Sequence, residues 1–483
     1  MIIRRLYDRK LAQTSYLIGC GRMGSGLVID PNRDIEQYIH AAEVEGVKIT
    51  HVTETHIHAD FVSGARELAQ RIGATLYLSD EGDENWKYAY AKEAGAILMK
   101  GGDTFNVGNV KVDVVHTPGH TPEHVSFLVT DTAAADQPIG VVTGDFVFVG
   151  DVGRPDLLER AAQIEGTMER AARTLFRSLQ QFKGYPDWLQ IWPGHGAGSA
   201  CGKGLSAVPH STVGYERLSN WAFAYENEDA FVPAVLAGQP EPPKYFAEMK
   251  RINKEGPRVL HGFRRPERLP LTRLDEALNS KAIVVDTRHA ADYAAAHVPG
   301  TVNIPLNNSF TTWAGWLIPF DRDFYLVVSE QCTHCIDEAV RDLAMIGLDR
   351  VAGYFGSTVV DQWAATGRKL DSVPQVTSNE LAERLQRGDV AVVDVRGRAE
   401  WEAGHLPTVP NIPLGYLNDR LAEIPADKPV VVHCQTGGRS AIAASLLRAQ
   451  GVTNVMNLTG GFAGWQNARH PVERDAAERV PEK

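Results

Sequence analysis

Four short apolar runs in this 483-residue chain each lead into residues that can bind a metal ion. Each run has the length and composition of a buried strand. Loops that follow strands in α/β proteins meet at one edge of a sheet, so ligands from distant parts of a chain converge there. We therefore predict an α/β layered domain whose rim holds a metal. The runs and their loops are 47–53 with 55–60, 110–115 with 118–120, 139–142 with 143–145, and 189–192 with 193–195.

A helix is predicted just before the first of these strands. Asp34 can cap it, apolar positions from Ile35 to Ala42 recur at helical spacing, and Gly46 can end it. This order of helix and strand supports the layered α/β arrangement.

The first metal loop lacks a ligand that a two-metal site would need. Residues 55–60 read Thr-His-Ile-His-Ala-Asp, and Phe61 follows where a two-metal hydrolase would carry another histidine. A phenyl ring cannot ligate a cation. The loop therefore favours a single, open-sided metal ion over dinuclear hydrolysis. One His-x-His-x-Asp string is a weak signal by itself, whereas four such loops in order are a strong one.

Residues 1 to about 250 resemble the metallo-β-lactamase superfamily, and more narrowly its persulfide dioxygenases. The match is carried by segments 55–60, 118–122 (Pro-Gly-His-Thr-Pro), 143–145 (Thr-Gly-Asp), 150–156 (Gly-Asp-Val-Gly-Arg-Pro-Asp) and 193–196 (Pro-Gly-His-Gly). The resemblance implies one Fe(II) per chain on His56, His120 and Asp145. Two histidines and one carboxylate leave open positions, as mononuclear iron oxygenases need. His58, Asp60 and His195 are then either hydrogen-bonding neighbours of the ligands or further ligands.

Length, composition and charge indicate the number of domains, the location in the cell and the kinds of partner. A chain of this length should contain about three domains. No apolar run is long enough to span a membrane, and Met1–Arg5 lacks the apolar core of a signal peptide, so we expect a cytoplasmic protein without a membrane partner. The net charge of -11 argues against nucleic acid as a partner. Flat α/β surfaces commonly pack in homo-oligomers, and we expect one here.

The C-terminal half contains a repeat with an offset of about 100 residues, which suits two copies of a small α/β domain. Matching segments are Asp286-Thr287-Arg288 with Asp394-Val395-Arg396, His297 with His405, 303–306 with 411–414, Gly347 with Gly451, and Trp363 with Trp465. Residues 253–270 read as the linker before the first copy and 367–374 as the joint between copies. The predicted domains are 1–252, 264–370 and 375–475.

The second copy holds a reactive cysteine. Strand 430–433 leads into Cys434, and an Ala- and Leu-rich helix follows. Glycines allow successive backbone N–H groups to turn toward one point and hold an anion. These groups, the helix N-terminus and Arg439 should lower the pKa of Cys434 and favour a persulfide anion on its sulfur. The remaining members of this loop are Gln435, Thr436, Gly437, Gly438 and Ser440.

Residues from about 375 to 475 resemble an active rhodanese, a sulfurtransferase domain. Four residues separate Cys434 from Arg439, as in rhodaneses, whereas the related phosphatases carry one more. In the first copy, alignment on Gly347 places Glu330 at the position of Cys434, where a carboxylate would repel sulfur anions. We therefore interpret residues 264–370 as a pseudo-rhodanese that packs or positions its neighbours.

The other cysteines have open roles. Five cysteines in so long a chain are no disulfide framework. Cys332 and Cys335 form a C-x-x-C that either binds metal, acts in redox chemistry or is an ordinary pair of loop cysteines. Cys20 lies in an apolar run and is expected in the core. Cys201 follows His195 closely and either handles sulfur near the iron, with Lys203 or Arg154 holding an anionic thiol, or packs.

The two resemblances together imply a persulfide dioxygenase that converts a small thiol persulfide and dioxygen to thiol and sulfite, coupled to rhodanese transfer between persulfide and sulfite or thiosulfate. The sequence identifies neither the thiol nor the direction of the transfer. One alternative is a zinc-dependent thioester hydrolase of the glyoxalase II type fused to a sulfurtransferase. The other is a non-catalytic sulfur carrier.

Overall fold

The computed structural model describes residues 1–160, 166–239 and 241–474 and divides into two compact units. The first unit contains Met1–Phe263 with Arg341–Gly347, and the second contains Arg264–Val340 and the described residues from Leu348 onward. Apart from 341–347, both predicted rhodanese-like domains fall in the second unit. Residue 475, the predicted end of the last domain, lies outside the described residues.

Two six-stranded sheets form the centre of the first unit, with orders β1-β2-β3-β4-β5-β6 and β12-β11-β10-β9-β8-β7. Apolar side chains of β2 and β3 share one core with those of β8 to β11, so the sheets pack face to face. The strands are β1 (Ile2–Asp8), β2 (Gln13–Cys20), β3 (Ser25–Ile29), β4 (Lys48–Thr53), β5 (Thr75–Ser79), β6 (Ile97–Met99), β7 (Thr104–Val107), β8 (Val110–His116), β9 (Val125–Asp131), β10 (Gly140–Gly144), β11 (Gln190–Pro193) and β12 (Ser211–Thr212).

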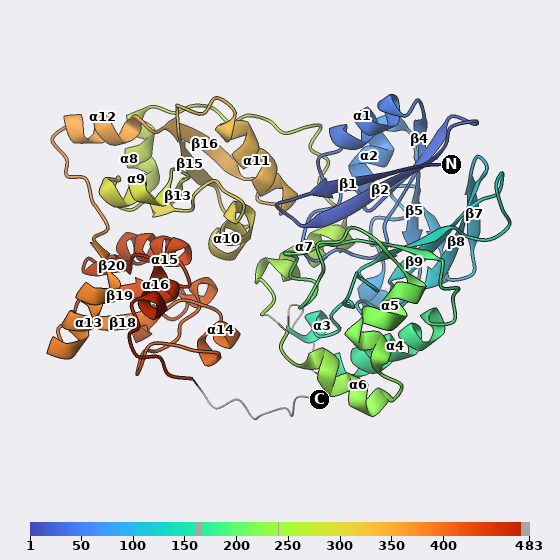
Figure 1. Cartoon of the computed structure of the whole chain (residues 1–483). Coiled ribbons are helices and arrows are strands. Elements are labelled where there is room, and N and C mark those ends of the chain that lie inside the picture. Colours follow the sequence, from blue (N-terminus) through green and yellow to red (C-terminus); the bar gives the residue numbers. More distant parts are fainter. Residues whose placement is uncertain (161–165, 240, 475–483) are drawn as a thin grey trace. The chain divides into compact units, whose positions relative to one another are not determined.

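Helices cover both outer faces of this sandwich. The buried faces of α1 and α2 pack on the first sheet, and α4 and α6 pack on the second (Figure 1). The predicted α/β layered domain is therefore confirmed, and its layers form an αββα sandwich. The helices are α1 (Glu36–Val44), α2 (Ala65–Ile72), α3 (Leu157–Arg160), α4 (Met168–Phe182), α5 (Val213–Ser219), α6 (Glu228–Leu236) and α7 (Tyr245–Glu255), with 3₁₀ turns η1 (Glu84–Trp86) and η2 (Trp221–Ala224).

Two local predictions need correction. Asp34 does not cap α1, because the helix begins at Glu36 and Ile35 occupies the cap position without a side-chain bond. The predicted linker beginning at residue 253 starts too early, because α7 continues to Glu255 and Asn253 is buried.

Sheet topology brings the metal-binding loops together. Strand β9 is antiparallel to both β8 and β10, and β10 is parallel to β11. Strands β8, β10 and β11 therefore run in the same direction and end at the same edge. Because residues 118–120, 143–145 and 193–195 follow these three strands, they meet at that edge, as the sequence predicted.

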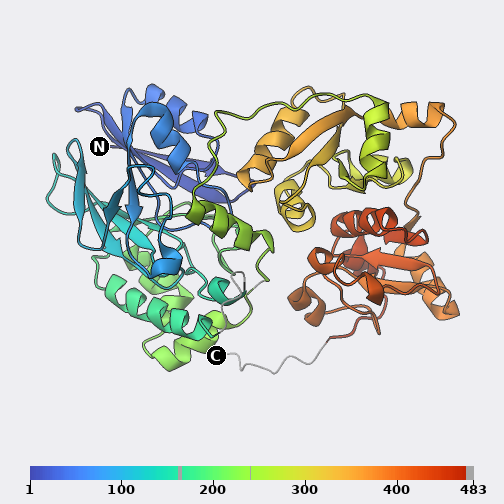
Figure 2. The ribbon, with the colours of Figure 1, turned by 180° about the vertical axis from the view of Figure 1, so that it is seen from behind.

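Two four-stranded sheets lie in the second unit, one in each repeat, with orders β14-β13-β15-β16 and β17-β20-β19-β18. All their pairings are parallel. Figure 2 shows the two sheets from behind, the first in yellow and orange and the second in orange and red. The strands are β13 (Ile283–Asp286), β14 (Val302–Asn303), β15 (Phe324–Val328), β16 (Val351–Gly356), β17 (Gln375–Val376), β18 (Ala391–Asp394), β19 (Val430–His433) and β20 (Val455–Leu458).

The remaining helices flank these parallel sheets. They are α8 (Leu271–Asn279), α9 (Ala290–Ala295), α10 (Phe310–Leu317), α11 (Cys335–Met345), α12 (Val359–Ala365), α13 (Ser378–Arg387), α14 (Arg398–Glu402), α15 (Gly438–Ala449) and α16 (Gly461–Asn467), with 3₁₀ turns η3 (Leu414–Tyr416) and η4 (Leu421–Glu423). Among the described residues, no helix combines the length and apolar composition needed to cross a membrane.

The repeat predicted from sequence recurs in matching contacts. Arg288 pairs with Asp286, and Arg396 pairs with Asp394, each at 2.7 Å. The His297 ring stacks on Tyr293 and the His405 ring on Trp401, each with centroids 3.8 Å apart. In both copies an asparagine side chain, Asn303 or Asn411, donates to the backbone carbonyls of the Asp and Arg. The two copies therefore share one frame.

Candidate functional site

The structure brings His56, His120 and Asp145 together, which we call the metal triad. Nε2 of His56 lies 3.9 Å and Nε2 of His120 lies 3.6 Å from Oδ2 of Asp145. All three side chains are buried. Nε2 of His56 and Oδ2 of Asp145 have no hydrogen-bond partner among the described residues. Because buried polar atoms without partners are costly, this convergence fits a metal ion as their common partner.

Hydrogen bonds behind the two histidines orient their rings. Nδ1 of His120 donates to the carbonyl of Arg154 at 3.1 Å, and Nδ1 of His56 bonds to the Thr55 hydroxyl at 2.9 Å. A carbonyl only accepts, so neutral His120 carries its proton on Nδ1 and presents an Nε2 lone pair to the triad. Burial lowers the pKa of His120 and holds that of His56 well below its ordinary value. Both rings are therefore neutral and able to ligate.

His195 bridges two carboxylates beside the triad. Its Nδ1 lies 2.7 Å from Oδ1 of Asp145, and its Nε2 lies 2.8 Å from Oδ2 of Asp60. Burial lowers the pKa of His195, but the carboxylates of Asp145 and Asp60 outweigh it and raise that pKa well above its ordinary value. For Asp145, burial alone would raise the pKa, but the neighbouring His195 outweighs burial and holds the pKa well below its ordinary value. Asp145 therefore remains ionised. This bond occupies Oδ1 and leaves Oδ2 for the metal.

His58 lies outside the triad and is hydrogen-bonded instead. Its Nε2 lies 3.1 Å from Oδ1 of Asp30, and its ring packs on Phe61 with centroids 4.4 Å apart. Burial lowers the pKa of His58, but Asp30 outweighs it and raises the pKa to about 9. Asp30 also accepts from the Thr55 backbone and hydroxyl. We did not predict Asp30; its signal is a carboxylate directly after β3.

Two more residues of this site were missed. His124 accepts a bond from the Asp145 backbone N–H at 3.1 Å and stacks on the His56 ring, with centroids 5.1 Å apart. Its signal was a second histidine in the segment 118–124. Asn253 donates to the carbonyls of His58 and Phe61 at 2.8 and 2.7 Å. It therefore clamps the first metal loop from α7, and no local pattern marks it.

Cys201 lies beside the metal triad. Its sulfur and the ligand atoms of Asp60 and His195 lie within 4.8 Å of one another, and all three residues are buried. Burial and then the carboxylates of Asp60 and Asp145 raise the pKa of this thiol well above its ordinary value. Cys201 is therefore a buried, neutral thiol beside Asp60 and His195. Its two roles, sulfur handling and packing, stay predictions.

The two cations expected to hold an anionic thiol are otherwise engaged. The Arg154 guanidinium is buried and pairs with Asp156 at 2.8 Å. The Lys203 ammonium donates to the carbonyls of Ala234 and Ala237 and lies 4.2 Å from the Trp221 ring centroid. That interpretation is wrong for both residues, because each charge already has a specific partner.

The second reactive centre is Cys434, in the loop Cys434–Ser440 that we call the sulfur loop. The Gly437 N–H donates to its sulfur at 3.2 Å, and the Ser440 hydroxyl does so at 3.5 Å. Gly437 has a φ of 106°, which favours glycine, and α15 begins at the next residue. The strand, the glycine turn and the helix start are thus placed as the sequence predicted.

The carbonyls of the sulfur loop are fixed from the side by α16. Phe462 N–H donates to the Cys434 carbonyl at 2.7 Å, and Ala463 N–H donates to that of Gln435 at 2.9 Å. A Cβ on Gly461 would lie 2.3 Å from the Cys434 carbonyl oxygen, so only glycine allows this approach. These hydrogen bonds satisfy both carbonyls and keep them directed toward α16.

Arg439 donates no hydrogen bond to the Cys434 sulfur. Its guanidinium makes a bidentate pair with Glu400 at 2.6 and 2.7 Å. Burial raises the pKa of Glu400, but the bond from Arg439 outweighs it and the pKa falls below its ordinary value. The side chain of Gln435 accepts from Arg396 at 3.2 Å. The loop is therefore held by charged residues of its own copy.

A cavity of about 590 Å³ separates the sulfur loop from the first copy. Thr436, Gly437 and Gly438 line one side of it. Ala291 and Ala294 of α9, from the first copy, line the other side. The predicted pseudo-rhodanese therefore supplies an alanine wall opposite the active loop.

The first copy has no sulfur loop of this kind. Its connection from β15 to α11 spans six residues, 329–334, against four, 434–437, in the second copy. Strand pairing places Asp286 opposite Val327 and Asp394 opposite His433, so the next residues, Val328 and Cys434, correspond. Alignment on Gly347 was therefore displaced by two residues, and Glu330 pairs with Arg268 instead. Cys332 and Cys335 form a disulfide, and Cys20 is a buried core residue.

A two-sheet sandwich with a buried His/His/Asp centre, joined to two parallel-sheet domains of which one presents a cysteine loop, defines a metal-binding protein with sulfurtransferase-type domains. Residues 8–195 match the metallo-beta-lactamase superfamily, and residues 271–360 and 377–468 match the rhodanese-like domain. A crystal structure of a metallo-beta-lactamase from Staphylococcus aureus subsp. aureus COL is 43% identical with a TM-score of 0.68, covering 74% of this chain and 99% of that one. The chain belongs to the metallo-beta-lactamase superfamily and carries tandem rhodanese-like domains.

Two curated proteins match separate parts of the chain. A sulfurtransferase from Allochromatium vinosum is 39% identical over 99 residues, which are 20% of this chain and 91% of that protein. A beta-lactamase hydrolase-like protein from Xylella fastidiosa is 27% identical over 248 residues, which are 47% of this chain and 53% of that protein. The chain thus spans about half of the latter.

Proposed function

We propose that this protein is a persulfide dioxygenase coupled to a sulfurtransferase. The observation that carries the proposal is the metal triad, with Phe61 buried at the position where a second metal would need a histidine. The balanced reaction is RSSH + O₂ + H₂O → RSH + SO₃²⁻ + 2 H⁺. A ferrous ion on His56, His120 and Asp145 would supply the oxygen chemistry and an open position for the persulfide sulfur.

The surrounding residues would hold this centre in one protonation state. The Arg154 carbonyl keeps the Nδ1 proton on His120, and His195 keeps Asp145 ionised. Asp30 holds His58 away from the triad, so three ligands remain. Cys201 would provide a neutral sulfur beside the substrate. Because this thiol is uncharged, it would not repel a bound persulfide anion.

The sulfur loop would use the sulfite. A second RSSH would transfer its outer sulfur to the Cys434 thiolate, giving RSH and Cys434–S–S⁻. This persulfide would pass its outer sulfur to sulfite, giving Cys434–S⁻ and S₂O₃²⁻; the reverse reaction would load Cys434 from thiosulfate. Gly437 N–H and the Ser440 hydroxyl would stabilise the sulfur anion in either direction. The adjacent cavity, with its alanine wall, offers space for a small thiol or oxyanion.

Metal content and oxygen uptake test the first half. Protein loaded anaerobically should hold about one iron per chain and consume oxygen only when a thiol persulfide is added. His120→Ala should lose both properties, while His40→Ala, an exposed histidine on α1, should keep them. Two zinc ions per chain with turnover that needs no oxygen would instead establish the hydrolase alternative.

Product analysis tests the coupling. Wild-type protein given persulfide and oxygen should accumulate thiosulfate, whereas Cys434→Ser should accumulate sulfite at an unchanged rate of oxygen uptake. Cys20→Ser is the matched control, because it removes a thiol of the first unit outside the metal triad. Equal thiosulfate yields from wild type and Cys434→Ser would refute the coupling.

A further inference from the structure

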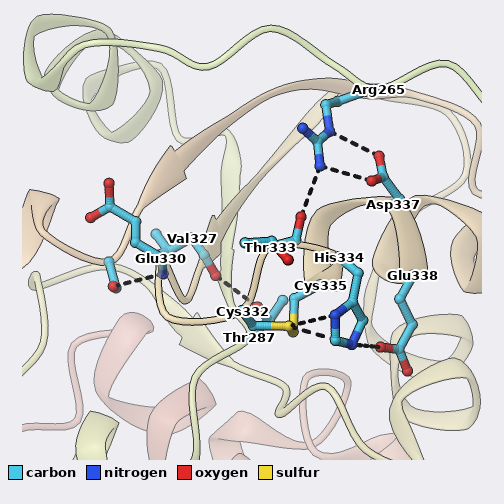
Figure 3. Close-up of a disulfide and its surroundings, with 11 residues drawn as sticks. Arg265, Thr287, Val327, Glu330, Cys332, Thr333, His334, Cys335, Asp337 and Glu338 are labelled. Atoms are coloured by element: carbon cyan, nitrogen blue, oxygen red, sulfur yellow. Dashed lines mark hydrogen bonds and ion pairs between the residues drawn. A yellow bond between two sulfur atoms is a disulfide. The ribbon is translucent and has the colours of Figure 1, made fainter.

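The disulfide Cys332–Cys335 lies on the wall of a large cavity in the first rhodanese-like copy. This cavity is about 760 Å³ and opens at the edge where β13, β15 and β16 end. Both cysteines line it and are half-buried, so a small molecule in the cavity would meet them. Figure 3 shows their disulfide with the residues around it. Thr287, Ser329 and Thr358 contribute polar groups to the same wall.

We propose that this pair is a thiol–disulfide exchange site for small thiols whose carrier is neutral or positively charged. The first copy, which lacks the sulfur loop, would thus have a redox activity of its own. This inference goes beyond the proposed function and does not rest on it, because it involves neither the metal triad nor Cys434.

The bridge itself contributes little as a structural link. It joins residues only three apart in sequence, and closing so short a loop restricts the unfolded chain much less than closing a long one. The loop before α11 is also held without it. Arg265 pairs with Asp337 at 2.7 Å and donates to the Thr333 carbonyl at 3.1 Å (Figure 3). An accessible pair with this spacing therefore suits exchange better than stabilisation.

Local geometry distinguishes the two sulfurs. Cys335 is the first residue of α11, a helix of eleven residues, so a thiolate on Cys335 gains from the helix N-terminus. The His334 ring lies against the Cys332 sulfur, with its nitrogens 3.7 and 3.6 Å away, and Glu338 lies 3.8 Å from that ring (Figure 3). The helix N-terminus makes Cys335 the better leaving group when Cys332 is attacked, and the His334 ring favours the Cys332 thiolate that the second attack releases.

The exchange balances without a further oxidant. A thiolate RS⁻ attacks the sulfur of Cys332, the S–S bond breaks, and the electron pair leaves on Cys335 as a thiolate. This gives the mixed disulfide R–S–S–Cys332. A second RS⁻ attacks the sulfur of R in this bond and releases RSSR. The Cys332 and Cys335 thiolates then take up two protons, so the pair is reduced as two thiols are oxidised.

The charge of the cavity selects the carrier. Asp292, Glu330 and Asp361 line it, against Arg288 and His289. Glu330 pairs with Arg268, and the Arg288 guanidinium pairs with Asp286 at 2.7 Å and donates to the Ala296 carbonyl, so these two charges are already engaged. Asp292 and Asp361 form no ion pair among the residues that the structure describes. A thiol with a carboxylate or sulfonate carrier would be repelled, whereas an ammonium would be attracted.

The test compares three thiols on the full-length protein: cysteamine, 2-mercaptoethanol and 3-mercaptopropionate, at equal thiolate concentration. Reduction is followed by alkylation and peptide mass spectrometry of residues 332–335. At low salt we expect cysteamine to react about tenfold faster than 3-mercaptopropionate, and high salt to diminish the ratio. Equal rates would overturn the proposed carrier class.

Two pairs of variants test whether the acidic residues of the cavity cause the preference for cysteamine. Asp292→Asn with Asp361→Asn should lower the cysteamine preference by about threefold. Asp321→Asn with Asp323→Asn makes the same charge change before β15, at the opposite sheet edge, and should leave the preference unchanged. A preference that falls equally in both pairs would overturn the role of the cavity.

A trapping variant tests the order of attack. Cys335→Ser should hold a stable mixed disulfide on Cys332 after treatment with oxidised cysteamine, detected as an added mass on that peptide. A wild-type pair that stays oxidised under thiol concentrations that reduce free cystamine would overturn the exchange activity. So would a pair that is isolated as two thiols and is not closed by cystamine.

Discussion

The two rhodanese-like copies share a frame, and the loop that carries Cys434 in the second copy differs from its counterpart in the first. Each copy has the Asp–Arg pair, the stacked histidine and the asparagine that bonds both backbone carbonyls. In the second copy, four residues connect β19 to α15 and place Cys434 below a glycine turn. In the first copy the connection is two residues longer and contains a disulfide. The frame thus maintains the fold, while the loop decides the chemistry.

The same comparison shows what fixes the backbone of the sulfur loop. Its first two carbonyls accept hydrogen bonds from N–H groups of α16, and Gly461 allows that helix to approach. In the first copy the matching contact is the bond from Ser357 to Val328. A glutamate–arginine pair lies beside each loop, Glu400 with Arg439 and Glu330 with Arg268. Variants in matched positions can therefore test each difference separately.

The largest effect is expected from the nucleophile itself. Cys434→Ser should reduce sulfur transfer from thiosulfate to a thiol by roughly 10³-fold or more, because a hydroxyl does not form the persulfide. Sulfite release from thiosulfate measures this rate. Cys332→Ser, the matched change in the first copy, should leave it within about twofold. A comparable loss in Cys332→Ser would mean that the two copies act as one centre.

The next effect comes from the contact that fixes the loop carbonyls. In Gly461→Ala the new Cβ would meet the Cys434 carbonyl oxygen, so the loop or α16 must move. We expect a loss of sulfur transfer of about 10- to 100-fold and a destabilisation of about 1–3 kcal/mol. Steady-state rates and thermal unfolding measure the two quantities.

Gly388→Ala is the control for backbone strain. Gly388 also has a positive φ, 71°, but a Cβ there meets nothing within 4 Å. It should cost about 1 kcal/mol of stability and leave the transfer rate unchanged. If both variants lose activity equally, the close approach at Gly461 is not what shapes the sulfur loop.

A smaller effect is expected when the acid beside the loop is neutralised. Glu400→Gln should release the Arg439 guanidinium from its bidentate pair and make it available to an anionic donor. We expect the KM for thiosulfate to fall by about threefold, with kcat changed less. Glu330→Gln, the matched change in the first copy, should leave both parameters unchanged. A rise in KM in Glu400→Gln would show that the pair orients Arg439 for the donor rather than occupying it.

The strand pattern predicted that the four metal-binding loops meet at one edge, and the resemblance to the metallo-β-lactamase superfamily implied which of their residues form the metal triad. The sequence did not reveal Asp30, His124 or Asn253. Asn253 bonds to His58 across 195 residues, and such a contact depends on how α7 packs rather than on any local pattern. The strand and glycines of the sulfur loop were likewise predicted, but the Arg439–Glu400 pair was not, because the approach of α14 to α15 is a tertiary contact.

Alignment of the two copies shows where sequence comparison fails. The alignment counted back from Gly347 and ignored that the loop before α11 is two residues longer than the loop before α15. It therefore placed Glu330 at the position of Cys434. The strand pairings of the two sheets correct this by two residues and place Val328 there. Insertions in loops move the register between strand and helix, so only contacts within the sheet can fix it. The conclusion that the first copy lacks a nucleophile at this position is unaffected.

The smallest expected effect concerns the two glutamate–arginine pairs. Each pair should make the free energy of unfolding depend on pH, and the two dependences should differ. The Glu400 pKa lies below its ordinary value of 4.5 in the folded protein, because the bond from Arg439 outweighs burial. A carboxyl with a lowered folded-state pKa contributes stability that is complete above about pH 4.5 and is lost as the pH falls through the lower, folded-state value. Both partners are partly exposed, so the contribution should be only about 0.5–1 kcal/mol.

Urea unfolding of wild type and Glu400→Gln between pH 7 and pH 3.5 measures this contribution. The difference in unfolding free energy between them should shrink as the pH falls, since protonation removes the same charge that the substitution removes. The pKa of Glu330 is also below its ordinary value, but the main cause is the hydrogen bond donated by Thr358 rather than an arginine. Added salt should therefore weaken the Glu400 contribution more than that of Glu330, because screening acts on the ion pair more than on the hydrogen bond from Thr358. Equal salt sensitivity in Glu400→Gln and Glu330→Gln would show that both copies hold their loops by the same kind of contact.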